Sequence, residues 1–506
     1  MHWSDRFWWT IGFGLSLGLC GSMIQNFWTQ WNEDPFKLNI DGTADISSIP
    51  FPTITICPIM KALKSKLDIS SKFNQNLEPI ANLSDTELSQ LDVLIQLYSV
   101  PTLELNEKMD KFTDDSIYNL IEEMAPNLTY TMHECRWQQK KINCVEYFIP
   151  MVTGAGLCFA FNALNSRDIY TDESASALIN TKARSNLSNW SIETGYNGEY
   201  NGSEYPNRVP KSGREHGLDI VLSMNTRDHD AFCEGGNHGF QIGLNAPSDM
   251  ELIESSLNYI KPFTDTKIII KPTLFATLDG LGNYEPKQRN CYFKSERKLR
   301  FFKTYTQSNC NMECRANFTK QKCDCVKFSL PRDNDTEICG GASIDCYRTA
   351  WTESPNCNCL PSCKYTYYDL EMSSVKISDS EVKAMKSKMM GQEITRLSIY
   401  FDDQETMKIE KRINRYSLED ILAFCGGVLG LFLGVSLLSI IEIVYYFTLR
   451  LFWIIYRPRI GKVKAPLEKT TIGEIQRSKY WTVFRKRNAS FSSSISDILQ
   501  RLLLEV

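Results

Sequence analysis

The sequence has very few histidines and none of the common enzyme motifs. Only five histidines occur in 506 residues, so a histidine-based metal site is not expected. There is no G-x-S-x-G, H-E-x-x-H, P-loop or Rossmann glycine pattern, which removes the usual sequence signals for hydrolase, metalloprotease or nucleotide chemistry. A net charge of −4 gives no overall attraction for nucleic acid. We therefore predict no enzyme activity, no cofactor, no resident metal and no nucleic-acid partner.

Charged side chains are also missing from two long stretches. The first, residues 7–31, has Trp8 near one end and Trp28 near the other. These tryptophans are 20 residues apart, which is about 30 Å of helix and matches the apolar core of a bilayer. A cleaved signal peptide is the alternative, but no small-x-small cleavage site follows a short apolar core. We predict a transmembrane helix at 7–31 after a short cytoplasmic segment at 1–6.

The second stretch, residues 421–449, is interrupted by one charge, Glu442. It is followed by a tail, 450–506, with 12 Lys or Arg and four Asp or Glu. Because basic segments stay on the cytoplasmic side, we predict a second transmembrane helix at 421–449 and a cytoplasmic tail. Both termini would then be cytoplasmic, and residues 32–420 would be extracellular on a protein that crosses the plasma membrane twice.

Cysteine is frequent in the predicted extracellular segment, which holds 15 of the 17 cysteines. Cys323-x-Cys325 and Cys357-x-Cys359-x3-Cys363 also have spacings that suit zinc. An oxidising compartment favours disulfides instead, and the odd count leaves at least one cysteine without an intrachain partner. The segment also carries seven N-x-S/T acceptors for N-glycosylation. They are Asn82, Asn127, Asn186, Asn189, Asn201, Asn317 and Asn334.

Local patterns predict both helices and strands in residues 32–420. The predicted helices are 84–100, 114–124, one that begins at Ser308 with Cys310 and Cys314 on one face, and 378–391. The predicted strands are 51–57, 217–223, 240–244, 267–271 and 396–401.

The second apolar stretch carries the strongest functional signal. Gly426, Gly430 and Gly434 follow one another at intervals of four residues, so they share one helix face. This face is either a seam where helices pack closely or a pore wall where a break exposes carbonyl oxygens to ions. Glu442 favours the pore because a carboxylate within a span is costly unless it has a function. The alternative is that Glu442 reaches the cytoplasmic interface or pairs with Arg450.

Several motifs together identify a resemblance over nearly the whole chain. The chain resembles the degenerin/epithelial sodium channel family, and in particular its insect pickpocket-like branch. The motifs are Phe51–Cys57, Gly156–Asn162, Trp190–Tyr196, Tyr205-Pro206, the cysteine string 291–363, and Gly434-x-Ser436 with Glu442.

The resemblance implies a sodium-permeable, amiloride-sensitive channel, a homotrimer or a heterotrimer with related subunits. It implies an α+β membrane protein in which two transmembrane helices flank a large disulfide-rich extracellular domain of the acid-sensing/epithelial sodium channel type. The implied selectivity filter is Gly434, Val435, Ser436 and Glu442, and the implied gate is Ala423, Gly426, Gly427 and Gly430. The implied disulfides are Cys57–Cys158, Cys135–Cys144, Cys291–Cys363, Cys310–Cys359, Cys314–Cys357, Cys323–Cys346 and Cys325–Cys339, which leaves Cys233 over.

The chain departs from the family pattern at two informative places. The family's His-Gly motif has no counterpart in the six residues before Phe7. Arg289, two residues before Cys291, replaces the tryptophan that acid-sensing members carry at this position. The first departure keeps open a non-conducting partner subunit. A two-span receptor without a pore is a further alternative. For a channel, gating by a ligand or by force in sensory or epithelial cells fits the resemblance.

Overall fold

The computed structural model describes residues 3–33, 36–68, 71, 84–98, 109–175, 188, 190–228, 238–250, 258–353, 356–388, 392–404 and 406–452. The α-helices are α1 (Trp3–Glu33), α2 (Asp85–Tyr98), α3 (Ser116–Met124), α4 (Leu128–Thr131), α5 (Cys144–Tyr147), α6 (Ser166–Ile169), α8 (Pro286–Arg289), α9 (Gln307–Cys323), α10 (Ile344–Thr352), α11 (Asp379–Lys388), α12 (Leu418–Leu433) and α13 (Leu437–Tyr445). Short 3-10 turns include η1 (Ile46–Ser48) and η8 (Gly341–Ser343), and a π-helical turn, η9, covers Tyr446–Arg450.

The strands are β1 (Phe36–Asp45), β2 (Thr53–Pro58), β3 (Phe112–Thr113), β4 (Met132–Trp137), β5 (Lys140–Ile142), β6 (Phe148–Thr153), β7 (Gly156–Phe161), β8 (Leu218–Met224), β9 (Phe240–Asn245), β10 (Asn258–Ile260), β11 (Thr264–Thr277), β12 (Ile338–Cys339), β13 (Tyr365–Lys376), β14 (Glu393–Phe401) and β15 (Thr406–Asn414). The largest sheet runs β1-β15-β11-β14-β8-β4-β5, and β13 also pairs with β11. A second sheet runs β10-β9-β2-β7-β6.

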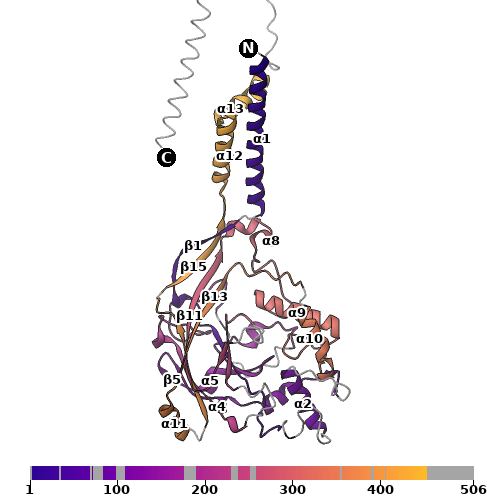
Figure 1. The fold of residues 1–506 in the computed structure, drawn as a ribbon, viewed down its shortest axis with the longest axis vertical. Helices are drawn as coiled ribbons and strands as arrows, with labels where there is room; N and C mark the ends of the chain where they lie inside the picture. Colours follow the sequence, from indigo (N-terminus) through magenta and orange to yellow (C-terminus); the bar gives the residue numbers. More distant parts are fainter. Residues whose placement is uncertain are drawn as a thin grey trace, which may run out of the picture. The chain divides into compact units, whose positions relative to one another are not determined.

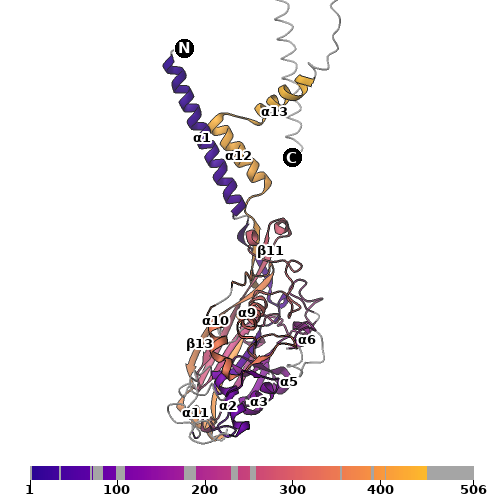
Figure 2. The same ribbon diagram turned by 90° about the vertical axis from the view of Figure 1, so that its right-hand side faces the viewer.

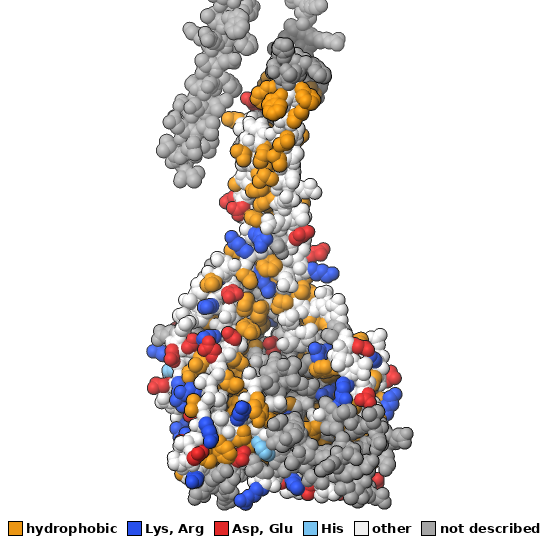
Figure 3. All heavy atoms as spheres, in the orientation of Figure 1, with side chains coloured by type: hydrophobic (Ala, Val, Ile, Leu, Met, Phe, Trp, Pro, Cys, Tyr) orange, Lys and Arg blue, Asp and Glu red, His pale blue; other side chains and the backbone are white. Residues whose placement is uncertain are grey.

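Two apolar helices, α1 and α12, lie side by side (Figures 1 and 2). The ring of Phe27 in α1 stacks on Phe424 in α12, with centroids 4.2 Å apart. Apolar side chains cover the outer surface of this pair in the space-filling view (Figure 3). Within the described residues, Phe7–Glu33 is the one helix long and apolar enough to cross a membrane by itself. The second apolar stretch forms two helices, α12 and α13, and has spanning length only when both are counted together.

The two apolar helices are joined directly to the largest sheet. Strand β1 follows α1, β15 precedes α12, and these strands pair antiparallel from Phe36↔Asn414 to Asp45↔Thr406. Next to them, β11 is central, because it pairs with β13, β14 and β15. Only two residues separate α1 from β1 and three separate β15 from α12, so the sheet is linked to both helices by short connections.

The core lies where the two sheets meet. All six residues of β2 and all six of β7 are buried. Between the sheets, the ring of Phe51 lies 5.3 Å from Phe401 and 4.9 Å from Trp137. Strands buried along their whole length are expected in the centre of a domain, where both faces are covered.

A lobe formed by residues 291–363, here called the disulfide lobe, contains α9 and α10 (Figure 1). The structure contains the seven disulfides that the resemblance implies, and five of them lie within this lobe. The five cysteines with zinc-like spacing are all bonded to other cysteines. Cys20 and Cys425, in the two apolar stretches, are free thiols, and Cys233 lies outside the described residues.

Candidate functional site: the broken second apolar helix

The second apolar stretch breaks at three of the four residues of the implied selectivity filter, Gly434, Val435 and Ser436. Helix α12 ends at Leu433, and α13 begins at Leu437. Gly434 has φ = +65°, a conformation that glycine adopts without the steric cost of a Cβ. Ser436 then caps α13, because its Oγ accepts a hydrogen bond of 3.2 Å from the Ser439 backbone N–H. The sequence therefore favours a break here through a glycine that ends one helix and a serine that starts the next.

A break of this kind changes what the backbone offers to a solute. The last four carbonyl groups of a helix have no partner within the helix, so the end of α12 presents acceptor oxygens next to Gly434. Irregular backbone at membrane depth is stable only where it is buried in protein or lines water. Carbonyl oxygens that replace hydration water are one way in which channels bind cations.

Glu442 is exposed in α13. The alternative pairing of Glu442 with Arg450 is not present among the described ion pairs. Arg450 instead lies over the ring of Tyr446, 4.6 Å from its centroid. Eight residues separate Glu442 from Arg450, which is about 12 Å along a helix.

The implied gate residues lie on the part of α12 that does not face α1. Phe424 stacks on α1, and Val428 is 6% exposed. The implied gate residues are instead all exposed: Ala423, Gly426, Gly427 and Gly430. A Cβ built at Gly426 or Gly427 would meet no atom within 4 Å. Their small size is therefore not explained by packing against the described part of this chain.

The N-terminal end of α12 carries two carboxylates, Glu419 and Asp420. The backbone N–H of Ser417 donates to Asp420 Oδ2 at 2.8 Å, and the Ser417 hydroxyl donates to the same oxygen at 3.0 Å. These bonds hold the pKa of Asp420 below its usual value. Asp420 therefore stays ionised at the end of α12 that follows β15.

Arg289, which the sequence singled out, is fully buried close to the end of α1. It pairs with Glu296 and donates from Nε to the carbonyl oxygen of Cys291 at 3.1 Å. Its neighbour Gln288 donates to the carbonyl oxygen of Asn32 in α1 at 3.3 Å. Arg289 thus holds in place the turn just before the disulfide lobe, and this turn contacts α1 through Gln288.

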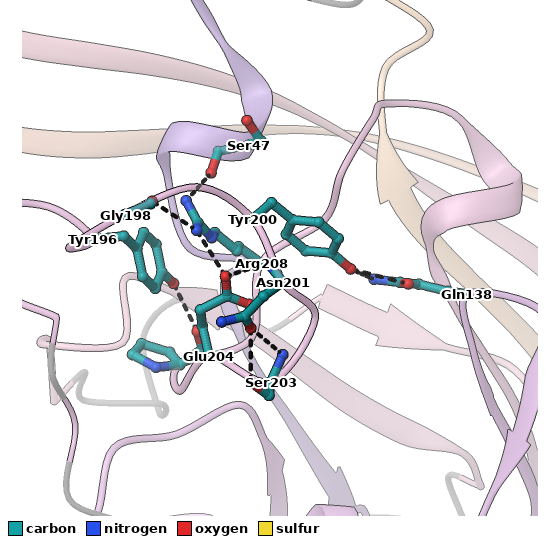
Figure 4. Close-up of polar contacts among 10 residues, drawn as sticks. Ser47, Gln138, Tyr196, Gly198, Tyr200, Asn201, Ser203, Glu204 and Arg208 are labelled. Carbon is teal, nitrogen blue, oxygen red and sulfur yellow. Dashed lines mark hydrogen bonds and ion pairs between the residues drawn. The ribbon is translucent and has the colours of Figure 1, made fainter.

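A second arginine, Arg208, ties the loop 190–210 to the segment after β1 (Figure 4). Its guanidinium donates to the carbonyl oxygen of Ser47 at 3.0 Å and pairs with Glu204 at 2.7 Å. It also lies 4.4 Å from the ring centroid of Tyr196. Sequence reasoning missed this cluster. The only local signal was Glu204 and Arg208 four residues apart around Tyr205-Pro206, which does not indicate a contact with residue 47.

A partly buried carboxylate, Asp92 of α2, was also missed. Its Oδ1 accepts from the backbone N–H of Gly341 at 2.7 Å, and its Oδ2 accepts from Gln96 at 2.9 Å. Burial, opposed by these hydrogen bonds, raises the pKa of Asp92 to about 6, and the charge of Asp110 adds to the rise. A Cβ at Gly341 would come within 2.0 Å of Asp92 Oδ1, so the contact requires glycine. Asp92 therefore links α2 to the disulfide lobe in a pH-dependent way.

Four of the predicted glycosylation acceptors can be located, and all four are exposed. They are Asn127, Asn201, Asn317 and Asn334. The other three, Asn82, Asn186 and Asn189, lie outside the described residues.

Comparison with known proteins gives a consistent result. The profile of a family described as "Amiloride-sensitive sodium channel" matches residues 1–446. Pickpocket protein 28 of Drosophila melanogaster is 25% identical over 473 residues, which cover 88% of this chain and 74% of that protein. Sodium channel protein Nach of Drosophila ananassae is 22% identical and covers 84% of this chain and 78% of its own. Acid-sensing ion channel 1C of Danio rerio is 23% identical, with coverages of 87% and 78%.

Proposed function

The chain belongs to the amiloride-sensitive sodium channel family and is a sodium channel subunit, and we propose that it forms an amiloride-sensitive trimer in the plasma membrane. The broken helix of residues 418–445 is the pore-lining element of each copy. Residues 7–31 and 421–449 cross the membrane, both termini are cytoplasmic, and residues 32–420 are extracellular. The trimer is a homomer or includes related subunits, and a ligand or force acting on the extracellular domain opens it in sensory or epithelial cells.

The observation that carries this proposal is the break at Gly434–Ser436. A helix that only anchors a receptor has no reason to interrupt its hydrogen bonds in an apolar segment, because each unpaired backbone group in lipid costs several kcal/mol. The cost is avoided when the break faces water and ions. Around a threefold axis, three sets of carbonyl oxygens and three Glu442 carboxylates would form the binding positions for sodium.

The exposed small-residue face of α12 supports the gate assignment. Ala423, Gly426, Gly427 and Gly430 are exposed, and a Cβ at Gly426 or Gly427 would meet no atom within 4 Å. Close approach between copies would require small side chains, because bulky side chains keep helix backbones apart. In this proposal the closed state brings these faces together, and opening separates them.

A partner subunit that does not conduct by itself is the second candidate. The two candidates are separated by expressing the chain alone and together with a conducting relative. A subunit that conducts gives sodium current when alone, and an obligate partner changes current only in the mixture. A two-span receptor without a pore changes neither.

The direct test of the filter adds bulk at its positions. Gly434→Val and Ser436→Phe are each expected to alter the sodium-to-potassium permeability ratio, because both positions lie at the break. Ser436→Thr keeps the capping hydroxyl and serves to separate the effect of bulk from loss of the cap. Gly12→Val is the matched glycine control, since a Cβ there meets no atom within 4 Å of the described structure. Unchanged selectivity in both bulky variants would remove Gly434–Ser436 from the filter.

A further inference from the structure

A groove of about 520 Å³ lies in the ectodomain between α4, α5, β6 and β7. Its walls are mostly apolar and include Val145, Phe148, Ile149 and Pro150. The contributing helices α4 and α5 lie at the end of the domain remote from α1 (Figure 1). A hollow of this volume is in the range in which proteins hold ligands of several rings.

The groove lies beside β6, an edge strand of the second sheet. Strand β6 is the last strand in the order β10-β9-β2-β7-β6 of the described sheet. Val145 beside it is 56% exposed. The residues of β6 are themselves buried or half-buried, so the exposed apolar side chain of the groove is Val145, and exposed apolar surface of this kind often has a binding partner.

Asn127, one of the predicted glycosylation acceptors, lines this groove itself. Its Oδ1 accepts hydrogen bonds from the backbone N–H of Tyr130 at 2.8 Å and from the Thr129 hydroxyl at 3.0 Å. Both bonds use the oxygen of the amide, so the cap of α4 is compatible with a sugar on Nδ2. Thr129 is also the hydroxyl residue of the N-x-T acceptor sequence.

We propose that a glycan attached to Asn127 folds back into this groove and covers it. Attachment joins Nδ2 to C1 of the first N-acetylglucosamine, while the bond from C1 to a lipid-linked diphosphate breaks and the amide proton leaves with the diphosphate. The C–H face of the sugar ring and its acetyl methyl group pack on Val145, Ile149 and Pro150. The carboxylates of Glu122 and Glu146, which also line the groove, accept hydrogen bonds from sugar hydroxyls. The proposal rests on the extracellular location proposed for residues 32–420.

The test compares two glycans on the same folded protein. Asn334 is the reference, because it is exposed and is not part of this groove. The full chain is expressed in animal cells, purified in mild detergent and treated with a glycosidase, and release at each site is followed by glycopeptide mass spectrometry. Release from Asn127 should be at least about tenfold slower than from Asn334 in the folded protein. This ratio corresponds to ~1.4 kcal/mol of free energy for binding of the glycan in the groove. The two rates should be equal after denaturation.

Two exposed valines give matched variants. Val145→Gln places a polar side chain in the groove, and Val375→Gln makes the same change on β13, where Val375 is 66% exposed. Release from Asn127 should accelerate to the Asn334 rate in Val145→Gln and stay slow in Val375→Gln. Equal rates in the wild-type protein would overturn the proposal. Slow release that Val145→Gln does not change would overturn it too, and would assign the protection to another copy or partner.

Occupancy separates this inference from the proposed topology. Glycans at Asn334 or Asn201 with an unmodified Asn127 would overturn the groove assignment and leave the extracellular location intact. An absence of glycans from Asn127, Asn201, Asn317 and Asn334 together would overturn the extracellular location itself.

Discussion

The disulfide lobe and the broken helix α12–α13 are stabilised in opposite ways. Helix α9 in the lobe is largely polar, and its cysteines Cys310, Cys314 and Cys323 are bonded to other parts of the lobe. Helix α12 is apolar and uncross-linked, and Leu422 and Leu431 on its surface are 65% and 80% exposed. Disulfides within the lobe stabilise its fold, whereas α12 has no cross-link and its stability depends on what packs against it. Mutations should therefore lower stability in the lobe and shift conformational equilibria in α12.

The largest effect is expected from breaking the lobe's long-range disulfide. Cys310 and Cys359 are 49 residues apart in sequence, but Cys314–Cys357 closes almost the same loop, so the loss should be the ~2–4 kcal/mol typical of a disulfide rather than more. The double variant Cys310→Ser/Cys359→Ser should lower the thermal midpoint of the ectodomain by many degrees and reduce delivery to the cell surface. Cys425→Ser, which removes a free thiol of α12, is the control. A midpoint that is the same in both variants would mean that burial rather than cross-linking stabilises α9.

Next in size is the pH dependence centred on Asp92, at the boundary between the lobe and α2. Its folded pKa of about 6 lies above the usual 3.8, so the folded state binds a proton more tightly than the unfolded chain. Stability should rise as pH falls from about 6 to about 4, by up to ~3 kcal/mol. Above pH 6 the buried charge is a constant cost. Asp92→Asn keeps the shape and should flatten this rise while increasing stability at pH 7.5.

The measurement is the thermal midpoint between pH 4 and pH 8 for the wild type, Asp92→Asn and the exposed control Asp335→Asn. A rise on acidification that survives in Asp92→Asn would place its origin in another group. The wild-type rise should be unchanged in Asp335→Asn.

In α12, by contrast, a substitution should act on gating. Ala423→Phe adds a ring on the exposed small-residue face, and overpacking costs ~1–3 kcal/mol. If the cost falls on the closed state, the open-to-closed ratio rises by up to about a hundredfold. A standing amiloride-blockable sodium current is the expected result. Leu422→Phe, one residue away on a different part of the surface, should leave the resting current near the wild-type value. Equal resting currents in the two variants would show that Ala423 does not face the gate.

The smallest effect is expected at Glu442. Glu442→Gln removes a charge with little change of shape. A carboxylate near an ion in watery surroundings contributes about 1 kcal/mol, so sodium conductance should fall two- to fivefold at low salt and less at high salt, where screening is strong. Single-channel recording at two ionic strengths makes the comparison. A conductance of Glu442→Gln that equals the wild-type value at both ionic strengths would indicate that Glu442 faces lipid or the interface.

The local elements agree well with expectation, because their signals lie within a few residues. Helix α2 starts at the predicted position, where Ser84 and Glu87 cap each other's backbone N–H groups. Helix α9 carries Cys310 and Cys314 on one face as predicted, but its cap is Thr306 rather than Ser308, since the Thr306 Oγ1 accepts from the Asn309 N–H at 3.1 Å. The five predicted strands are all present, and β11 is much longer than residues 267–271.

The elements that were missed need partners distant in sequence. Strands β13 and β15 mix apolar, charged and polar residues, and in the structure both are paired with β11. The same applies to Arg208, which bonds to Ser47 across 161 residues, and to Asp92, which bonds to Gly341 across 249. No local pattern can encode contacts across such separations.

The sequence by itself therefore determined the apolar stretches, their charged and tryptophan borders, and the glycines spaced four residues apart, whereas the end of α12 before Gly434 and the Ser436 cap of α13 replaced the single helix predicted at 421–449. Each of these depends on transfer into lipid or on hydrogen bonds between near neighbours. Only the tertiary structure decided that the implied gate residues are exposed, that a partly buried carboxylate contacts Gly341 and that Asn127 borders an apolar groove. Burial is a property of what lies opposite a side chain, and here the opposing groups come from remote parts of the chain.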